Sequence, residues 1–144
     1  MKKQYRAREG SPFSNKEAQI VGETLNNLRD RKGELTTERI VETARNETSP
    51  LHKYFEWSDN TASELYRLQQ ARHIINHVVE IVVVGTEQVK QRSFFSIETS
   101  NRKTAYVTIK QAIETESYRK QLLGRAIVQL ENLTITLRMF KDVE

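Results

Sequence analysis

The chain has 144 residues, no cysteine, a formal net charge of +4 and a mean hydropathy of −0.67. This length suits one domain with a modest core, and the lack of cysteine excludes disulfides and thiolate zinc sites. No apolar run approaches the roughly 18 residues of a membrane span. No apolar segment follows the N-terminus, as a secretory signal requires. These features predict a soluble cytoplasmic protein.

Positive charge is concentrated in two places. Residues 1–13 hold Lys2, Lys3, Arg6 and Arg8 against one acidic residue and show no periodicity, which predicts a flexible basic arm. Residues 88–110 are also strongly basic, whereas residues 34–58 are net negative. Phosphate binding would therefore depend on the arm and on residues 88–110. Alternatively, the arm is only a solubilising tail.

The first half of the chain reads as helical. Ser14 and Glu17 have the spacing of a capping box, which predicts a helix that begins there and ends near Gly33. A second helix is expected from Thr36 or Thr37 to about Arg45, and a third over residues 60–77.

In the second half of the chain, the spacing of the apolar residues changes from a helical period to the alternation of strands. Residues 78–84, 92–99 and 104–109 read as three short strands, the last two forming a hairpin. Residues 116–141 predict a long amphipathic helix, with an apolar stripe at alternating spacings of three and four residues. That stripe comprises Leu123, Ala126, Leu130, Leu133, Leu137 and Phe140. The expected fold is a single α+β domain over residues 14–144, with a three-helix half (14–77), a small antiparallel three-stranded sheet (78–110) and the long helix (116–141).

Residues 40–55 have the spacing of a helix–turn–helix. Apolar residues mark two short helices on either side of a polar run, and the side chains between the apolar anchors are short or basic. That pattern suits a small helix held by its apolar side while its polar side enters a DNA groove. The candidate base contacts are Thr48, Ser49, His52 and Lys53. Alternatively, this is an ordinary pair of packed helices, and the aromatic residues Tyr54, Phe55 and Trp57 anchor the core.

Two family resemblances follow from these residues. The segment from Thr36-Thr37 through Leu51-His52-Lys53-Tyr54-Phe55 resembles the helix–turn–helix of tetracycline-repressor-type regulators. The strands of the second half do not fit that family's ligand domain, so an inducer-binding repressor is not implied. More broadly, residues 49–57 and 66–72 resemble a group of uncharacterised phage and prophage proteins. This second resemblance implies a phage or mobile-element origin, and location in a bacterial host cell or in a virion, but no particular activity.

The predicted hairpin is a second candidate DNA contact. If Phe95, Ile97, Ala105, Val107 and Ile109 face the core, strand alternation places Arg92, Phe94, Tyr106 and Lys110 on the other face. Arg102 and Lys103 then lie at its tip. Basic residues between aromatic ones on a two-stranded ribbon suit a nucleic-acid groove or a single strand. The alternative is an outer face that water or the last helix covers.

Enzymatic motifs are missing from the sequence. There is no Gly-rich phosphate loop and no Gly-x-Ser-x-Gly elbow. His73 and His77 lie one helical turn apart with Glu80 beyond them, but a third metal ligand would have to come from elsewhere. We expect no enzyme, no metal, no cofactor and no small-molecule substrate.

The sequence thus predicts a non-enzymatic DNA-binding protein of phage or mobile-element type that forms a homo-oligomer. Lys2, Lys3, Arg6, Arg8, Arg92, Arg102 and Lys103 would contact DNA together with the four helix–turn–helix residues. Leu130, Leu133, Leu137 and Phe140 would form the oligomer interface. The alternative is a structural or assembly protein that forms a multimer without reading DNA.

Overall fold

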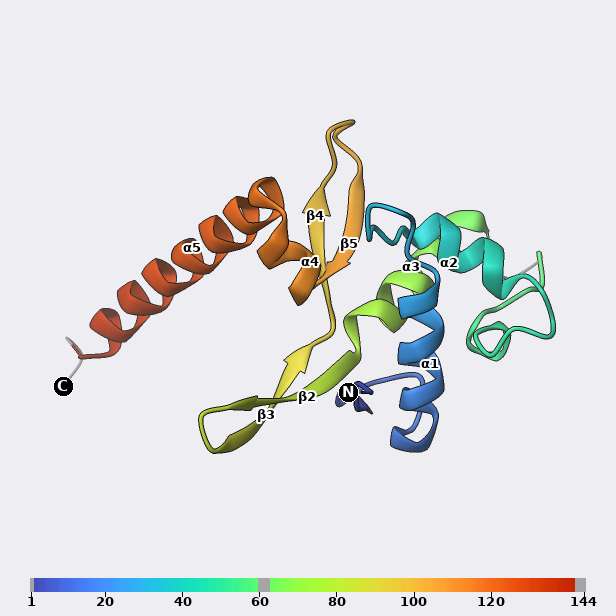
Figure 1. The fold of residues 1–144 in the computed structure, drawn as a ribbon, viewed down its shortest axis with the longest axis horizontal. Helices are drawn as coiled ribbons and strands as arrows, with labels where there is room; N and C mark the ends of the chain where they lie inside the picture. The colour runs from blue at the N-terminus through green and yellow to red at the C-terminus, as the bar shows by residue number, and fades with distance from the viewer. Residues whose placement is uncertain (1, 60–62, 142–144) are drawn as a thin grey trace.

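A computed structural model describes residues 2–59 and 63–141 of the chain. Its helices are α1 (Asn15–Asn27), α2 (Thr37–Ala44), the 3₁₀ turn η1 (His52–Tyr54), α3 (Glu64–Asn76), α4 (Ile109–Glu114) and α5 (Glu116–Lys141). Its strands are β1 (Tyr5–Ala7), β2 (Val78–Val84), β3 (Glu87–Arg92), β4 (Phe94–Glu98) and β5 (Thr104–Thr108). The fold is therefore α+β, with two small antiparallel sheets and a long C-terminal helix (Figure 1).

Side-chain caps define where the helices begin. Ser14 caps α1 in the predicted capping box, since its hydroxyl accepts from Glu17 N while the Glu17 carboxylate accepts from Ser14 N. Thr36 caps α2, and Ser63 caps α3. The predicted start of the third helix at residue 60 lies outside the described residues. The apolar faces of α1, α2 and α3 form one core that contains Leu25, Ile40 and Ile74.

The predicted flexible arm is wrong for residues 5–7, which form β1. Strand β1 pairs antiparallel with β2, and β2 pairs with β3, in a three-stranded sheet of order β1-β2-β3. Tyr5 is 2% exposed and Phe13 4% exposed, so the expected arm is fixed to the core at two points. The arm is ordered because long-range pairing with β2 supplies the backbone hydrogen bonds that three isolated residues lack.

The predicted hairpin is confirmed as β4 and β5, but it forms a separate two-stranded sheet. The strand expected over residues 92–99 breaks at the buried Ser93, so that residues 87–92 join the first sheet instead. Both faces of the hairpin are covered. Ile97, Ala105 and Val107 pack with α4 and Tyr118, as expected for the inward face. The expected outward aromatics Phe94 and Tyr106 are buried in the main core, which corrects that prediction.

The second helix of the predicted helix–turn–helix is also wrong, because residues 52–54 form only the single 3₁₀ turn η1. In an α-helix the carbonyl of His52 would accept from the backbone N–H of Glu56. Here the indole N–H of Trp57 and the backbone N–H of Phe55 donate to that carbonyl, and Glu56 N donates to Gln70 Oε1 instead. The aromatic anchor is confirmed, because Phe55 is buried in the core with Tyr54 and Trp57 packed against it.

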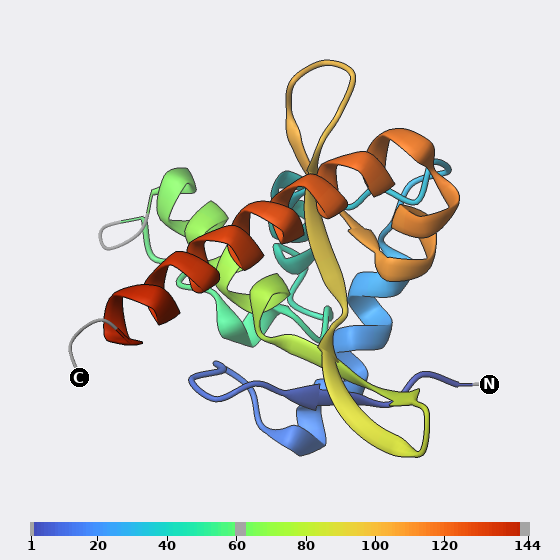
Figure 2. The same ribbon diagram turned by 90° about the vertical axis from the view of Figure 1, so that its left-hand side faces the viewer.

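Helix α5 matches the predicted bounds of 116–141 and leaves the body of the protein almost at once. Tyr118 is its only described buried residue, and every residue from Leu123 to Lys141 is exposed. In Figure 1 the helix extends away from the hairpin and from α1–α3, and Figure 2 shows the same helix from its outer side. At 1.5 Å per residue the free segment is roughly 28 Å long.

Candidate interaction surfaces

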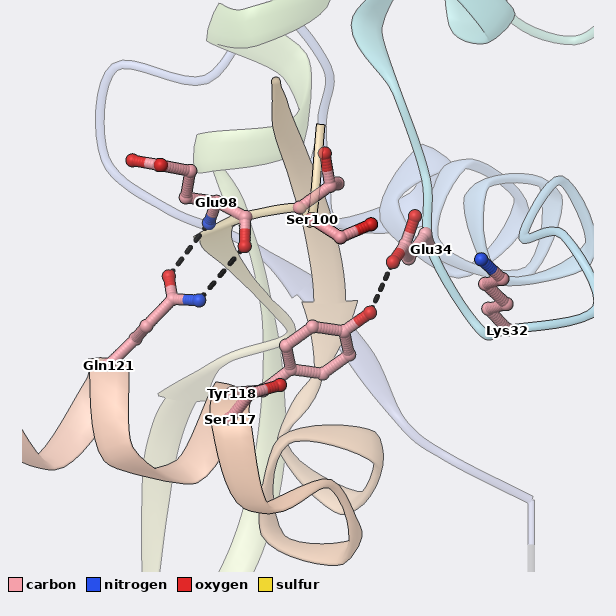
Figure 3. Close-up of a pocket in the computed structure, with 8 residues that line it drawn as sticks. Lys32, Glu34, Glu98, Ser100, Ser117, Tyr118 and Gln121 are labelled. Atoms are coloured by element: carbon pink, nitrogen blue, oxygen red, sulfur yellow. Dashed lines mark hydrogen bonds between the residues drawn. The ribbon is translucent and has the colours of Figure 1, made fainter. Parts of the chain in front are cut away.

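A polar pocket of about 520 Å³ lies where α5 joins the body (Figure 3). The Tyr118 hydroxyl points across it and donates to the Glu34 carboxylate. Desolvation, followed by this hydrogen bond, raises the pKa of Tyr118 to about 12. Gln121 accepts from Glu98 N at 2.7 Å and donates to Glu98 O at 2.9 Å. These groups satisfy one another, so their hydrogen bonds fix the direction in which α5 leaves the body.

Each lysine of the predicted arm lies within ion-pair distance of a carboxylate of the same chain. Lys2 lies 3.0 Å from Glu23, and Lys3 lies 3.7 Å from the buried Glu80. These ion pairs reduce the charge that either lysine offers to a phosphate. Lys2 and Lys3 therefore also connect the N-terminal segment to α1 and to β2.

The four polar residues expected to approach bases all make contacts within the chain, and Ser49, His52 and Lys53 line one pocket. His52 Nδ1 lies 2.8 Å from the carbonyl of Ala44, and its ring stacks on Trp57 with centroids 5.0 Å apart. Lys53 pairs with Glu17 at 2.5 Å, which holds the pKa of Glu17 down at about 2. The Thr48 hydroxyl donates to Asn46 Oδ1 at 2.8 Å, and the Ser49 hydroxyl accepts from Leu51 N at 3.2 Å.

Arg102 and Lys103 occupy the tip of the β4–β5 hairpin, as the sequence predicts. Both are exposed, and Arg102 adopts a left-handed conformation with φ of 59°. The tip lies at the opposite end of the molecule from the β2–β3 turn (Figure 1). These two cations are therefore separated from the basic residues of the first sheet.

The structure brings together three arginines that are far apart in the sequence. Arg8 Nη1 donates to Asn76 O at 3.5 Å, and Arg92 Nη2 donates to Asn76 Oδ1 at 2.5 Å. Desolvation lowers the pKa of Arg92, and the positive charges of Arg8 and Arg125 lower it further. None of the described carboxylates forms an ion pair with any of the three. We call Arg8, Arg92 and Arg125 the arginine cluster.

Sheet register adds a fourth cation beside this cluster. Arg6 and Arg92 both pair with Val79, one from each neighbouring strand, so their side chains share one face of the sheet. Arg6 and Arg8 near the N-terminus and Arg92 in β3 are all predicted DNA contacts, and strand pairing places Arg6 and Arg92 on one face with Val79 of β2 between them.

Arg125 was not predicted as a contact. It comes from α5, where its guanidinium donates to the hydroxyl of Ser96 at 2.9 Å and to the carbonyl of Ser96. With Arg92 it lines a groove of about 470 Å³ between α5 and strands β3 and β4. The sequence does hold a signal for it, because Arg125 and Glu131 are the only charged residues between Lys120 and Arg138. An isolated charge in an apolar stretch often has a specific partner.

The predicted oligomer residues are all exposed on the free part of α5. Leu130 is 64% exposed, Leu133 56%, Leu137 60% and Phe140 72%. The same helix exposes further large apolar side chains, namely Leu123, Ile127, Val128, Ile135 and Met139. None of these belongs to either core cluster of the described residues. The stripe is therefore not used to close this chain's own core.

Neither a metal site nor a membrane span emerges from the described residues. No three His, Asp or Glu side chains gather as metal ligands within residues 2–59 and 63–141. His77 Nδ1 lies 2.6 Å from the carbonyl of His73. The described helices include none with the length and apolar character needed to cross a bilayer.

Comparison with protein families, with curated proteins and with solved structures finds no match to this chain.

Proposed function

We propose that this chain is a non-enzymatic DNA-binding protein of phage or mobile-element type that acts as an oligomer. The observation that carries the proposal is the arginine cluster, together with Arg6 on the same side of the first sheet. Its guanidinium groups come from three separate segments of the chain and have no carboxylate partner among the described residues. Crowded, unpaired cations gain from a polyanion because the phosphates relieve their mutual repulsion.

The proposal places the contact on the phosphate backbone. Arginine forks donate two hydrogen bonds to a phosphate, and such contacts give affinity without reading the sequence. The polar residues of 48–53 are largely held by their neighbours, which supports a backbone-binding mode over base readout by that segment. Arg102 and Lys103 remain a second, separate contact in the proposal.

Salt dependence of binding to a DNA duplex tests the contact. Arg8→Gln with Arg92→Gln removes two cluster charges, so the slope of log affinity against log salt should fall by about 2, because each phosphate contact contributes about 0.9. Lys16→Gln with Arg31→Gln is the matched control, since both residues are exposed and unpaired among the described residues and the net charge changes equally. Equal slopes for the two variants, or no binding by the wild type at low salt, would overturn the proposal.

A second candidate function is that of an assembly protein that builds a multimer without binding DNA. The exposed apolar residues of α5 favour it, because contiguous exposed apolar surface marks interaction sites. Mass in solution, measured beside retention on DNA at low and high salt, separates the two. A large mass without DNA retention supports assembly, and salt-sensitive retention supports DNA binding.

A further inference from the structure

We infer that the free segment of α5 pairs antiparallel with α5 of a second copy of this chain. This inference rests on the self-association part of the proposed function, and its tests are carried out without DNA. The seam consists of Leu123, Ala126, Leu130, Leu133, Leu137 and Phe140, which repeat at spacings of 3, 4, 3, 4 and 3 residues. Such spacing keeps one apolar line facing a partner helix along the whole segment.

Side-chain volumes favour the antiparallel arrangement. In a two-fold symmetric contact, residue i facing residue j requires that j also faces i. One antiparallel register pairs Leu123 with Phe140 of the second copy, Ala126 with Leu137, and Leu130 with Leu133. The small Ala126 then meets a large leucine, and all six seam residues have partners. A parallel pair would instead face Ala126 with Ala126 and leave a gap in that layer.

The residues that border the seam carry no charge in the middle of this register. Ile127 would lie beside Thr134 of the second copy, and Gln129 beside Thr136. Uncharged borders let two copies of a basic chain approach without the repulsion that like charges cause. The two charges in this part of the helix, Arg125 and Glu131, lie outside the seam positions.

The shape of the molecule also favours this arrangement. The body of the chain lies at the N-terminal end of α5, and the C-terminal end projects freely (Figures 1 and 2). Parallel helices would force two bodies together at one end, whereas antiparallel helices place them at opposite ends. The N-terminal end of the seam opens into the groove between α5 and the strands, where Phe95, Leu122 and Ala126 line the wall. In the proposed register Phe140 of the second copy reaches this apolar wall.

Mass in solution tests whether the seam is used. The wild type should exceed the mass of one chain, and Leu133→Asp with Leu137→Asp should reduce it to one chain, because an unpaired charge in the seam is costly to bury. That variant should keep its fold, since both side chains are exposed in the single chain. Val128→Asp with Ile135→Asp is the matched control on the opposite side of α5 and should keep the larger mass. A single-chain wild-type mass, or a loss of association only in the control, would overturn the inference.

Cysteine cross-linking tests the direction, and the cysteine-free chain gives no background. Leu123→Cys and Phe140→Cys are prepared separately, mixed under conditions that exchange subunits, and oxidised. The antiparallel pair predicts disulfide-linked dimers in the mixture and little linkage in either variant alone. Self-linkage of Leu123→Cys alone would overturn the antiparallel direction and leave self-association standing. This outcome is distinct from failure of the oligomer, which the mass alone reveals.

Discussion

The aromatic ring of Tyr5 lies directly against the backbone of Gly22, so that a side-chain carbon at position 22 would overlap the ring. This contact fixes β1 to α1 and explains why residues 5–7 hold a defined place in the fold. Gln19 supports the same contact, because its amide oxygen accepts from Tyr5 N at 3.0 Å and its amide N–H donates to Lys3 O at 2.9 Å. The N-terminal segment is thus a structural strand that also carries Arg6 and Arg8.

Gly22→Ala should destabilise the protein by about 1–3 kcal/mol, because overpacking displaces Tyr5. The better helix propensity of alanine offsets at most about 1 kcal/mol of that cost. Gly124→Ala is the matched control, since Gly124 is also helical but has no atom within 4 Å of its added carbon. The control should stabilise slightly in chemical denaturation. Equal effects of the two substitutions would show that the Tyr5 contact contributes nothing.

Arg67 should hold residues 56–59 in place against α3. It is 5% exposed, and its guanidinium donates to the carbonyls of Glu56 and Trp57 and to the Asp59 carboxylate. Arg67→Met should cost about 1–3 kcal/mol, because two backbone carbonyls and the Asp59 carboxylate lose the donor that the buried guanidinium supplies. Arg72→Met, on the exposed side of the same helix, is the control and should change the denaturation midpoint little. A midpoint unchanged by Arg67→Met would contradict this role.

Two tyrosines should make the protein sensitive to strongly alkaline pH. Burial, with the charge of Glu80 adding to it, raises the pKa of Tyr5 to about 12, and the pKa of Tyr118 is raised to the same value. A raised pKa means that the folded state favours the neutral hydroxyl, so this stability is complete below about pH 10 and is lost as the pH rises through about 12. An absorbance titration of tyrosinate beside circular dichroism should show late ionisation together with unfolding.

Tyr118→Phe provides the control for that titration. It removes one late-ionising hydroxyl and its hydrogen bond to Glu34. The absorbance change near pH 12 should therefore be smaller than in the wild type, and the junction between α5 and the body should be less stable. If all tyrosines of the wild type ionise together near pH 10 with the fold intact, the two hydroxyls are not held as described.

Local signals predicted those parts of the fold that local interactions determine. The capping box at Ser14, the cap at Thr36 and the bounds of α5 each depend on residues within a few positions of one another. Strand β1 could not be found in this way, because its partner β2 lies more than seventy residues further along the chain. The second short helix of the expected helix–turn–helix (residues 40–55) does not form, because the side chains of Trp57 and Gln70 take the hydrogen bonds that would continue it.

The two candidate sites also differ in how far local sequence signals predict them. The exposed apolar stripe of α5 follows directly from its spacing, although only the structure shows that the chain's own core leaves it free. The arginine cluster depends on tertiary pairing, because its members come from the segment that follows β1, from β3 and from α5. Arg125 lies off the apolar stripe, so helical periodicity does not mark it. Its hydrogen bonds to the hydroxyl and the carbonyl of Ser96 fix where its guanidinium lies.

The contacts between α5 and β4 also limit how this chain can aggregate. Gln121 and Arg125 occupy the outward backbone groups of Glu98 and Ser96 along β4, and on the other side Leu35 exchanges two backbone hydrogen bonds with Tyr106 of β5. A strand edge left open would be a template for further strands and for amyloid-like stacking. Truncating α5 before Gln121 would therefore remove the helix that we propose to pair and uncover one such edge, which should make the chain prone to forming fibrils.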